Sequence, residues 1–548
     1  MRRGFLPLLL LLPFMVHAAR FDVWPGGSIQ NAVNTAGNGD TILVHDGMYV
    51  ETVVLYGKTL TLASEFLLTG DTAHVAQTII TPDFVRQDTG SCLVYAYGEG
   101  LEGRLVGLTM QGGTGTYWAH SENYAGGALY VHLSGVTVEN CRIQGSSAYR
   151  GGGIVVTYED AVRRSRLKLV NSVIRNCYAD MWGGGIFAYV CSLWVCGSII
   201  EDDFSPLEGG GLSLGDCAVQ LDSCIFQRCR SYSVAGVCCI GCNGRIADCV
   251  FRDNDGERDV NDLVVAHSWC PVVRCVFHGG SSESQSIVLI GSGEGAQRFF
   301  GNVVEGVQSL YVTGTLYAGR GYGEIAYNVF RNNVNVTGGV IYATDHTRVR
   351  IHHNVFDGNS SVFPNRGAAI RAVAFSYPWI DSNVVVNQIG PAMEFEEGTV
   401  YYLDARYNWW GDPTGPYHPT LNPGGRGDTL LQDSILFIPW LTEPPDTTMP
   451  SDLSERVRPE ISTTWRLMGI YPNPFNNTVR IIIAGFARND FRLTLHNLLG
   501  QEVDVIHAGA LTGGELSYTA SPTLSTGVYF LRASSRDNVE TRKIVFMK

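Results

Sequence analysis

Short apolar segments alternate with polar and glycine-rich corners along most of the chain, in a pattern that repeats about every 26 residues. Each repeat holds an apolar residue, two mostly polar positions, then Cys, Ser or Asn, and two mostly apolar residues. The Cys, Ser or Asn position, which we name the anchor, falls at residues 141, 172, 198, 224, 249, 275, 302, 328, 354, 383 and 408. A period this short cannot hold a pair of helices, so it predicts a coil of short strands.

Three more positions keep a fixed distance from the anchor and are mostly apolar. Val138 and Ile325 lie three residues before an anchor, and Ile143 lies two residues after one. Twelve residues before the anchor, several repeats carry Leu129, Ile186, Leu212, Val237, Leu263, Ile290 and Leu316. If each turn of the coil, or rung, pairs in parallel with its neighbours about 4.8 Å away, these positions stack through one core. The pattern predicts an all-β fold with three strands a rung, a right-handed parallel β-helix of about 11 to 13 rungs.

The beginning of the chain predicts an export signal. Arg2 and Arg3 precede an apolar run that ends near the small residue Ala18. This order is typical of a signal peptide, here residues 1–18, which is cleaved after Ala18. The apolar run is too short to span a bilayer comfortably, so we expect a soluble or surface-attached protein.

A short helix is predicted next, over residues 28–36. Ser28 is a suitable N-cap, and the apolar residues behind it follow helical spacing: Ile29, Ala32, Val33 and Ala36. An open β-helix end exposes unpaired backbone, so this helix is expected to cover it. The β-helix domain then extends over residues 19–441.

Composition limits the class of partner. The chain has 548 residues with 17% charged residues, 64 Gly and a net charge of −13. It has no long Lys/Arg run, so we expect no nucleic-acid partner, and we expect a monomer.

Cysteine and asparagine occupy the register positions. Of 14 cysteines, four are anchors and three lie seven residues before an anchor, at Cys191, Cys217 and Cys242. Side chains stacked one rung apart hold Cβ atoms about 4.8 Å apart, farther than the ~3.8 Å of a disulfide. We therefore expect buried ladders of mostly free thiols, continued by an asparagine ladder from Asn302 to Asn408. Cys239 and Cys242 form a C-x-x-C, but no second ligand pair follows at zinc spacing, so no metal site is assigned.

Two stretches resemble known β-helix proteins. The segment from Gly39-Asp40-Thr41-Ile42-Leu43-Val44 to Gly47-Met48-Tyr49 is similar to the N-terminal region of the pectin-lyase-like superfamily. Asn408-Trp409-Trp410-Gly411-Asp412-Pro413 resembles the parallel β-helix repeats of surface proteins. The resemblance implies the fold but no particular activity.

The last 107 residues change character. Residues 442–466 are rich in proline and polar residues without an apolar period, which predicts a linker. Residues 467–548 contain alternating segments at hairpin spacing, which predict a small β-sandwich.

This module resembles the C-terminal sorting domain of proteins exported by the type IX secretion system. The resemblance rests on Tyr471, Pro472, Asn473, Pro474, Phe475, Gly500, Gly527, Tyr529, Lys543 and Lys548. It implies that the type IX machinery is a partner and that the protein passes through the periplasm. The final location implied is secretion or attachment at the outer-membrane surface.

Side chains suited to cleaving polysaccharides are present, but they form no recognisable motif. They are Glu201, Asp202, Asp203, Arg348, Arg350, His352, His353, Glu394, Glu396 and Glu397. Gln87-Asp88-Thr89 and Trp379-Ile380-Asp381 look like fragments of pectin methylesterase and pectate lyase motifs without the remaining residues. Catalytic residues therefore stay unassigned. No cofactor is expected, apart from calcium at an acidic loop with Asp253, Asp255, Asp259 and Asp262.

Two hypotheses follow. The first is a noncatalytic, exported β-helix that binds glycans or acts as an adhesive surface protein. The alternative is a polysaccharide lyase, esterase or glycoside hydrolase that uses a groove beside the inserted loops. Aromatic side chains suited to stacking on sugar rings are Trp118, Tyr149, Trp182, Tyr189, Tyr232 and Trp269.

Overall fold

The computed structural model describes residues 18–83, 89–158, 165–279, 281–282, 285–291, 297–309, 314–336, 338–396, 402–451, 466–471, 475–484, 487–511, 514–521, 524–535 and 539–547. The predicted signal peptide lies outside these ranges except for Ala18. None of the helices within them is both long and apolar enough to cross a membrane.

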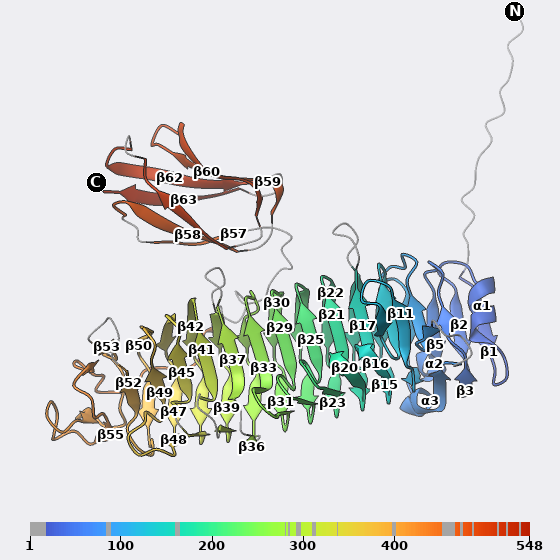
Figure 1. Ribbon diagram of the computed structural model, residues 1–548, viewed down its shortest axis with the longest axis horizontal. Helices are drawn as coiled ribbons and strands as arrows, with labels where there is room; N and C mark the ends of the chain where they lie inside the picture. The colour runs from blue at the N-terminus through green and yellow to red at the C-terminus, as the bar shows by residue number, and fades with distance from the viewer. Residues whose placement is uncertain are drawn as a thin grey trace, which may run out of the picture.

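The chain forms a right-handed parallel β-helix, followed by a separate antiparallel module (Figure 1). Three long parallel sheets, which we name A, B and C, contain 14, 13 and 13 strands. The predicted fold class is thus confirmed, with the number of rungs at the upper end of the expected range.

Sheet A carries the core position three residues before the anchor. Val138 pairs with Leu169, Glu324 of the later strands pairs with Arg350, and Ile325 pairs with Ile351. The core members of these pairs are fully buried. The strands of sheet A are β1 (Arg20–Val23), β2 (Thr41–Val44), β5 (Thr61–Ser64), β9 (Arg104–Val106), β14 (Gly135–Glu139), β18 (Arg166–Val170), β22 (Ser192–Cys196), β26 (Ala218–Asp222), β30 (Asn243–Ala247), β34 (Val272–Val273), β38 (Gln297–Phe300), β42 (Tyr322–Ala326), β46 (Arg348–His352) and β50 (Trp379–Asp381).

Sheet B carries the core position two residues after the anchor. Here phenylalanine rings stack along the axis, with centroids 5.0 Å apart for Phe226 and Phe251 and 4.8 Å apart for Phe251 and Phe277. The strands are β3 (Gly47–Val50), β6 (Thr78–Thr81), β10 (Thr109–Gln111), β15 (Arg142–Gln144), β19 (Val173–Arg175), β23 (Ile199–Glu201), β27 (Ile225–Gln227), β31 (Val250–Arg252), β35 (Val276–His278), β39 (Val303–Glu305), β43 (Val329–Arg331), β47 (Val355–Asp357) and β51 (Val384–Val386).

Sheet C confirms the third core position with one correction. Leu263 pairs with Ile287, which pairs with Leu316, so Ile287 and not Ile290 occupies the column. The extra residues of this rung follow the strand, which shifts a count made backwards from the anchor. The strands are β4 (Val53–Val54), β8 (Leu93–Tyr95), β13 (Leu129–His132), β17 (Ile154–Thr157), β21 (Ile186–Tyr189), β25 (Leu212–Gly215), β29 (Val237–Ile240), β33 (Val260–Ala266), β37 (Gln285–Ile290), β41 (Leu316–Gly319), β45 (Ile341–Thr344), β49 (Ile370–Ala372) and β52 (Met393–Phe395).

Many rungs hold a fourth short strand between sheets B and C, which the three-strand prediction lacks. These strands form one eight-stranded and one four-stranded sheet, and β11 and β12 form an antiparallel hairpin within the first. The eight are β7 (Thr89–Gly90), β11 (Gly115–Trp118), β12 (Asn123–Ala125), β16 (Ser147–Arg150), β20 (Tyr178–Trp182), β24 (Phe204–Ser205), β28 (Arg230–Ser231) and β32 (Asp255–Gly256); the four are β36 (Ser281–Ser282), β40 (Gln308–Ser309), β44 (Val334–Asn335) and β48 (Ser360–Ser361).

Polar ladders line the corners of the coil. Asn302 donates from its backbone N and its Nδ2 to Oδ1 of Asn328, at 2.8 and 3.0 Å, and Asn328 bonds to Asn354 in the same way. All fourteen cysteines are free, and all but Cys196 are buried. A second polar ladder lies five residues after the anchor and was not predicted. It includes Cys177, Asp203, Cys229, Asn254, Asn333 and Asn359.

A helix covers the first rung. Helix α1 (Ile29–Thr35) buries Ile29 and Val33, and the Ser28 side chain accepts a hydrogen bond from Asn31 N. The Glu51 carboxylate accepts hydrogen bonds from Ser28 Oγ and from the backbone N of Ile29, at 2.8 and 2.6 Å. Two more short helices, α2 (Phe66–Thr69) and α3 (Thr72–Gln77), lie between β5 and β6.

The last rung is closed by short strands and buried large residues. Strand β53 (Leu403–Asp404) pairs with β56 (Ile435–Leu436), and β54 (Pro416–Tyr417) pairs with β55 (Gly427–Thr429). Trp410 and Phe437 join the helix core. The described start of the predicted linker then runs along the β-helix, because Met449 packs against Phe300 and Ala326.

The C-terminal module is an antiparallel β-sandwich. One sheet consists of β57 (Arg466–Tyr471), β58 (Thr478–Ala484) and β61 (Gly514–Thr519); the other consists of β60 (Glu502–Leu511), β59 (Ala487–His496), β62 (Gly527–Ser534) and β63 (Val539–Phe546). Phe475, Leu493 and Leu531 are among the residues of its own buried core.

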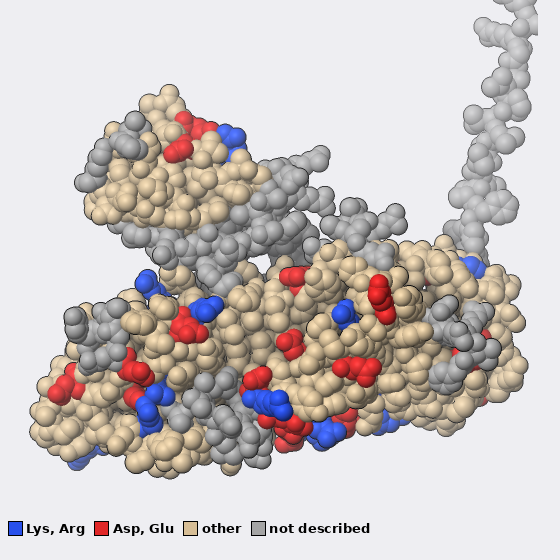
Figure 2. Space-filling view, in the orientation of Figure 1, with Lys and Arg blue, Asp and Glu red and all other residues tan. Residues whose placement is uncertain are grey.

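Charged side chains on the outside of the β-helix pair between rungs. Arg274 Nη2 lies 2.6 Å from Asp248 Oδ2, and Arg331 Nη2 lies 2.5 Å from Glu305 Oε2. Figure 2 shows acidic and basic side chains in small mixed groups on the face in view. Such exposed pairs contribute little to stability, about 0.5 kcal/mol each.

Candidate functional site

A row of polar side chains points outward from the first strands of sheet B. Alternation along β10, β15 and β19 turns Met110, Ile143 and Ile174 into the core, so the following residues, Gln111, Gln144 and Arg175, face outward. Their positions are equivalent in three successive rungs.

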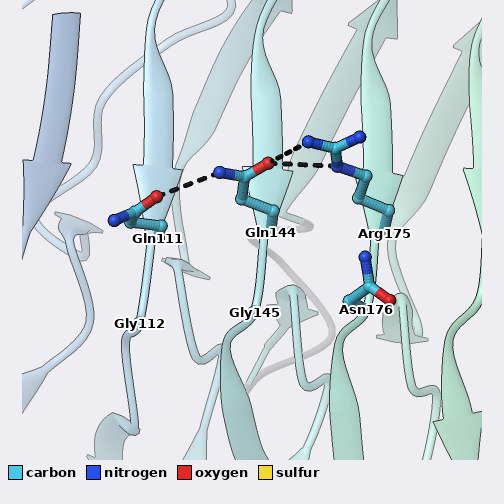
Figure 3. Close-up of a pocket in the computed structure, with 6 residues that line it drawn as sticks. All are labelled: Gln111, Gly112, Gln144, Gly145, Arg175 and Asn176. Atoms are coloured by element: carbon cyan, nitrogen blue, oxygen red, sulfur yellow. Dashed lines mark hydrogen bonds between the residues drawn. The ribbon is translucent and has the colours of Figure 1, made fainter. Parts of the chain in front are cut away.

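Hydrogen bonds fix this row. Gln144 Nε2 donates to Gln111 Oε1 at 2.9 Å, and Arg175 donates from Nε and Nη2 to Gln144 Oε1 at 3.0 and 2.7 Å (Figure 3). A guanidinium group has five N–H donors, of which Gln144 takes two. The row therefore presents amide and guanidinium groups in defined orientations.

A shallow hollow of about 420 Å³ lies against this row. It is lined by Gln111, Gly112, Gln144, Gly145, Arg175 and Asn176. Gly145 has φ +58°, and a Cβ there would meet nothing within 4 Å. The glycine corners thus leave open space beside the polar side chains, which can bond to hydroxyl or carboxylate groups of a ligand. The position three residues after the anchor marks this row in the sequence, but we did not predict it.

Aromatic rings continue on the next side of the coil. Tyr178 begins β20, two residues after Asn176, and its side is 42% exposed. Its ring centroid lies 5.6 Å from that of Phe204, which lies 6.1 Å from that of Tyr232. Exposed tyrosine rings of this kind can stack on sugar faces.

The predicted stacking residues do not share one surface. Trp118 is buried, and the Arg150 guanidinium lies 4.5 Å from the Trp182 ring centroid and 5.8 Å from that of Tyr149. These side chains pack on one another. Tyr189 and Tyr232 are exposed, and Trp269 is partly buried on a different strand row.

A second polar cluster lies outside sheet A near its C-terminal end. His352 Nε2 is 2.7 Å from Glu324 Oε1, and His352 Nδ1 is 2.7 Å from His353 Nδ1. Arg350 donates two hydrogen bonds to the Asp381 carboxylate, both at 3.0 Å. The cluster therefore combines two imidazoles, two carboxylates and a guanidinium.

Electrostatics differ among these groups. The hydrogen bond from His352 lowers the pKa of Glu324 below its ordinary value. Burial, and then the neighbouring His352, lowers the pKa of His353, which favours its neutral form at pH 7. A neutral imidazole can accept a proton.

The other predicted acidic residues do not converge on these groups. Glu201 and Asp202 both pair with Arg228, while Asp203 is buried in the corner ladder. Glu394 pairs with Arg366 and Arg371, Glu396 is exposed, and Glu397 lies outside the described residues.

The remaining fragments carry no shared site. Arg348 is exposed on β46, and Gln87 and Asp88 are outside the described residues. In Trp379-Ile380-Asp381, Ile380 belongs to the core column, as its burial shows.

The predicted calcium loop is divided between inside and outside. Asp262 is buried and accepts a hydrogen bond from Asn254 Nδ2 at 2.9 Å. Asp253, Asp255 and Asp259 are exposed. Calcium at this loop stays a prediction. Among the residues described, His, Cys, Asp and Glu ligand atoms gather in a metal-sized group at Asp46, Glu65 and His74 instead.

The resemblance residues of the C-terminal module have structural positions where they are described. Phe475 is buried and bonds through its backbone N to Val545 O, while Tyr529 donates from its hydroxyl to Ser525 O. Tyr471 ends β57, Gly500 lies in a turn with φ +77°, Gly527 begins β62, and Lys543 is exposed on β63. Pro472, Asn473, Pro474 and Lys548 lie outside the described residues.

Comparison with protein families identifies this module. Residues 469–547 match the family described as secretion system C-terminal sorting domain. No curated protein matches the chain. The module is a type IX sorting domain, so the chain is a secreted or cell-surface protein that interacts with the type IX secretion machinery.

Proposed function

We propose that the exported β-helix binds a polysaccharide noncatalytically, along the outward row formed by Gln111, Gln144 and Arg175. The observation that supports this most strongly is the open hollow beside a hydrogen-bonded row of amide and guanidinium groups. Their mutual hydrogen bonds hold the side chains in place before a ligand arrives, which lowers the entropy cost of binding.

The repeat of the fold suits a repeating ligand. Neighbouring rungs are about 4.8 Å apart, so an extended chain along the axis would meet a similar hydrogen-bonding group at each rung. Tyr178 and Phe204 offer ring faces on the adjoining side of the coil. The pectin-lyase-like resemblance agrees with a carbohydrate ligand.

Retention of the purified chain on immobilised polysaccharides tests this proposal. The panel should include neutral, uronate-containing and sulfated chains. We expect the Q144A/R175A double variant to lose at least tenfold in affinity for the retained polysaccharide, since it removes the centre of the row. R331A is the matched control, because Arg331 occupies the equivalent outward position of a distant rung and pairs with Glu305. Equal loss in both variants would contradict the proposed location.

A second candidate function is polysaccharide cleavage at the cluster of Glu324, His352 and His353. A neutral His353 could accept a proton from a sugar carbon, while Arg350 lies nearby to pair with a uronate carboxylate. Incubation with pectins, alginates and glycosaminoglycans, with and without calcium, tests it. Unsaturated or reducing-end products that disappear in H353A would support the enzyme. Their absence across the panel would exclude it.

Export is the remaining part of the proposal. We infer that the chain crosses the periplasm before the sorting module directs it through the outer membrane. The module would then be removed on release or remain during surface attachment.

A further inference from the structure

Five titratable side chains converge at one corner of the first rungs, far along the chain from the polysaccharide row. They are Asp22, His45, Asp46, Glu65 and His74. The sequence shows no metal motif here, because each ligand comes from a different turn of the coil or from the helical insertion.

The β-helix register brings the first of these groups together. Val44 pairs with Ser64 in adjacent strands of sheet A, so the next residues, His45 and Glu65, occupy equivalent positions one rung apart. His45 Nδ1 lies 3.1 Å from Glu65 Oε1. Asp46 follows His45 directly and turns the chain into β3.

The helical insertion between β5 and β6 adds the last group. Helix α3 carries His74, whose Nδ1 lies 2.9 Å from Asp46 Oδ1 and 3.6 Å from Glu65 Oε2. One ligand atom each from Asp46, Glu65 and His74 lies within 4.8 Å of the others. Thr78 Oγ1 donates to Asp46 Oδ1 at 3.2 Å and helps to orient that carboxylate.

His45 provides independent evidence that the corner lacks a component. Its side chain is only 9% exposed, and its ring stacks on Trp24 with centroids 3.5 Å apart. Its Nε2 is 3.0 Å from Asp22 Oδ1, yet its Nδ1 has no hydrogen-bond partner although it faces the Glu65 carboxylate. A buried nitrogen beside a carboxylate oxygen, without a hydrogen bond between them, is a costly arrangement unless a cation lies close by.

We propose that Asp46, Glu65 and His74 bind one divalent transition-metal ion of the zinc class, with His45 positioning Glu65. Imidazole and carboxylate donors together suit zinc, whereas magnesium and calcium prefer oxygen donors alone. Two donors on a tetrahedral zinc ion are roughly 3.4 Å apart, and the separations at this corner, 2.9 to 3.6 Å, are close to that value. The ion joins the helical insertion to the first rungs and so fastens the N-terminal end of the β-helix.

Metal titration of the purified full chain, after treatment with a chelator, tests the site. Zinc is added in a calorimeter, and cobalt is added as a spectroscopic probe. We expect one equivalent of zinc to bind the wild-type chain, and at least a hundredfold weaker binding in H74A and in E65Q. Bound cobalt should show visible d–d absorption without the near-ultraviolet bands of thiolate ligands, because the cysteines are not involved.

The control variant is H278A. His278 also lies beside a glutamate, with Nδ1 3.4 Å from Glu305 Oε1, but on an exposed face without further ligands. Its zinc affinity should equal that of the wild type. Chelation should lower the thermal midpoint of wild type and H278A by several degrees and leave that of H74A unchanged, which separates lost binding from misfolding.

Three results would overturn the proposal: no stoichiometric zinc binding by the wild type, equal affinity in the wild type and in a folded H74A variant, or thiolate bands in the cobalt spectrum. The first would mean that protonated histidines hold this corner through ion pairs alone.

Discussion

At the scale of single residues, Asp203 is the most unusual side chain of the β-helix. It is fully buried in the corner ladder, where Oδ1 accepts a hydrogen bond from Cys177 N at 2.7 Å and Oδ2 has no hydrogen-bond partner. Burial raises the pKa of its carboxyl well above the ordinary value. Equivalent positions of other rungs hold asparagine, whose Nδ2 donates to a backbone oxygen, as Asn333 does to Val304 O.

We predict that D203N stabilises the protein at neutral pH. Because the folded-state pKa of Asp203 is raised, the folded state keeps a proton that the unfolded state releases above its pKa near 3.9, so stability falls as pH rises from there. The asparagine has no such dependence. D203N should raise the free energy of unfolding at pH 7 by about 2 kcal/mol and give little gain at pH 3.5. Denaturant titrations at both values measure it, and a loss of stability at pH 7 would contradict the prediction.

At the scale of elements, the asparagine ladder connects the rungs from Asn302 to Asn408. Asn328 accepts two hydrogen bonds from Asn302 and donates to Phe299 O and to Asn354 Oδ1. We predict that N328A lowers the free energy of unfolding by about 3 kcal/mol, since it leaves buried donors and acceptors unpaired. The exposed change Q308A, one rung before it, should have an effect near zero. Equal denaturation midpoints for the two variants would show that the ladder adds no stability.

The repeat made much of the fold predictable, because core positions in a solenoid keep the same spacing from rung to rung. The sequence reveals the column of Val138 and Ile325 for this reason, and it fails at Ile290, where extra residues in one rung break the count. Helices α2 and α3 escaped prediction because four and six residues are too short for an apolar period.

The candidate sites were less predictable than the core. Outward side chains such as Gln144 and Arg175 face no packing constraint, so nothing in a single sequence separates them from ordinary surface residues. His45 and Glu65 become neighbours only through the rung register, which is visible once the strands are aligned. His352 and His353 were singled out by residue type, but their partner Glu324 lies 28 residues before His352 and was not.

At the scale of the whole molecule, the β-helix and the sorting domain have separate cores. We therefore predict that a chain without residues 469–547 still folds its β-helix but is not exported across the outer membrane. Cell fractionation should find it in the periplasm, while a full-length R175A variant reaches the surface or the medium. Surface exposure of the truncated chain would contradict the assigned role of the module.

The central claim is that this exported β-helix holds a polysaccharide without cleaving it. The most direct measurement is an equilibrium titration of the purified chain with the polysaccharide it retains, with the length of the polysaccharide measured in the same samples afterwards. We predict saturable binding and an unchanged length distribution. Shortened chains or new unsaturated ends, produced by wild type and lost in H353A, would contradict the claim and establish an enzyme instead.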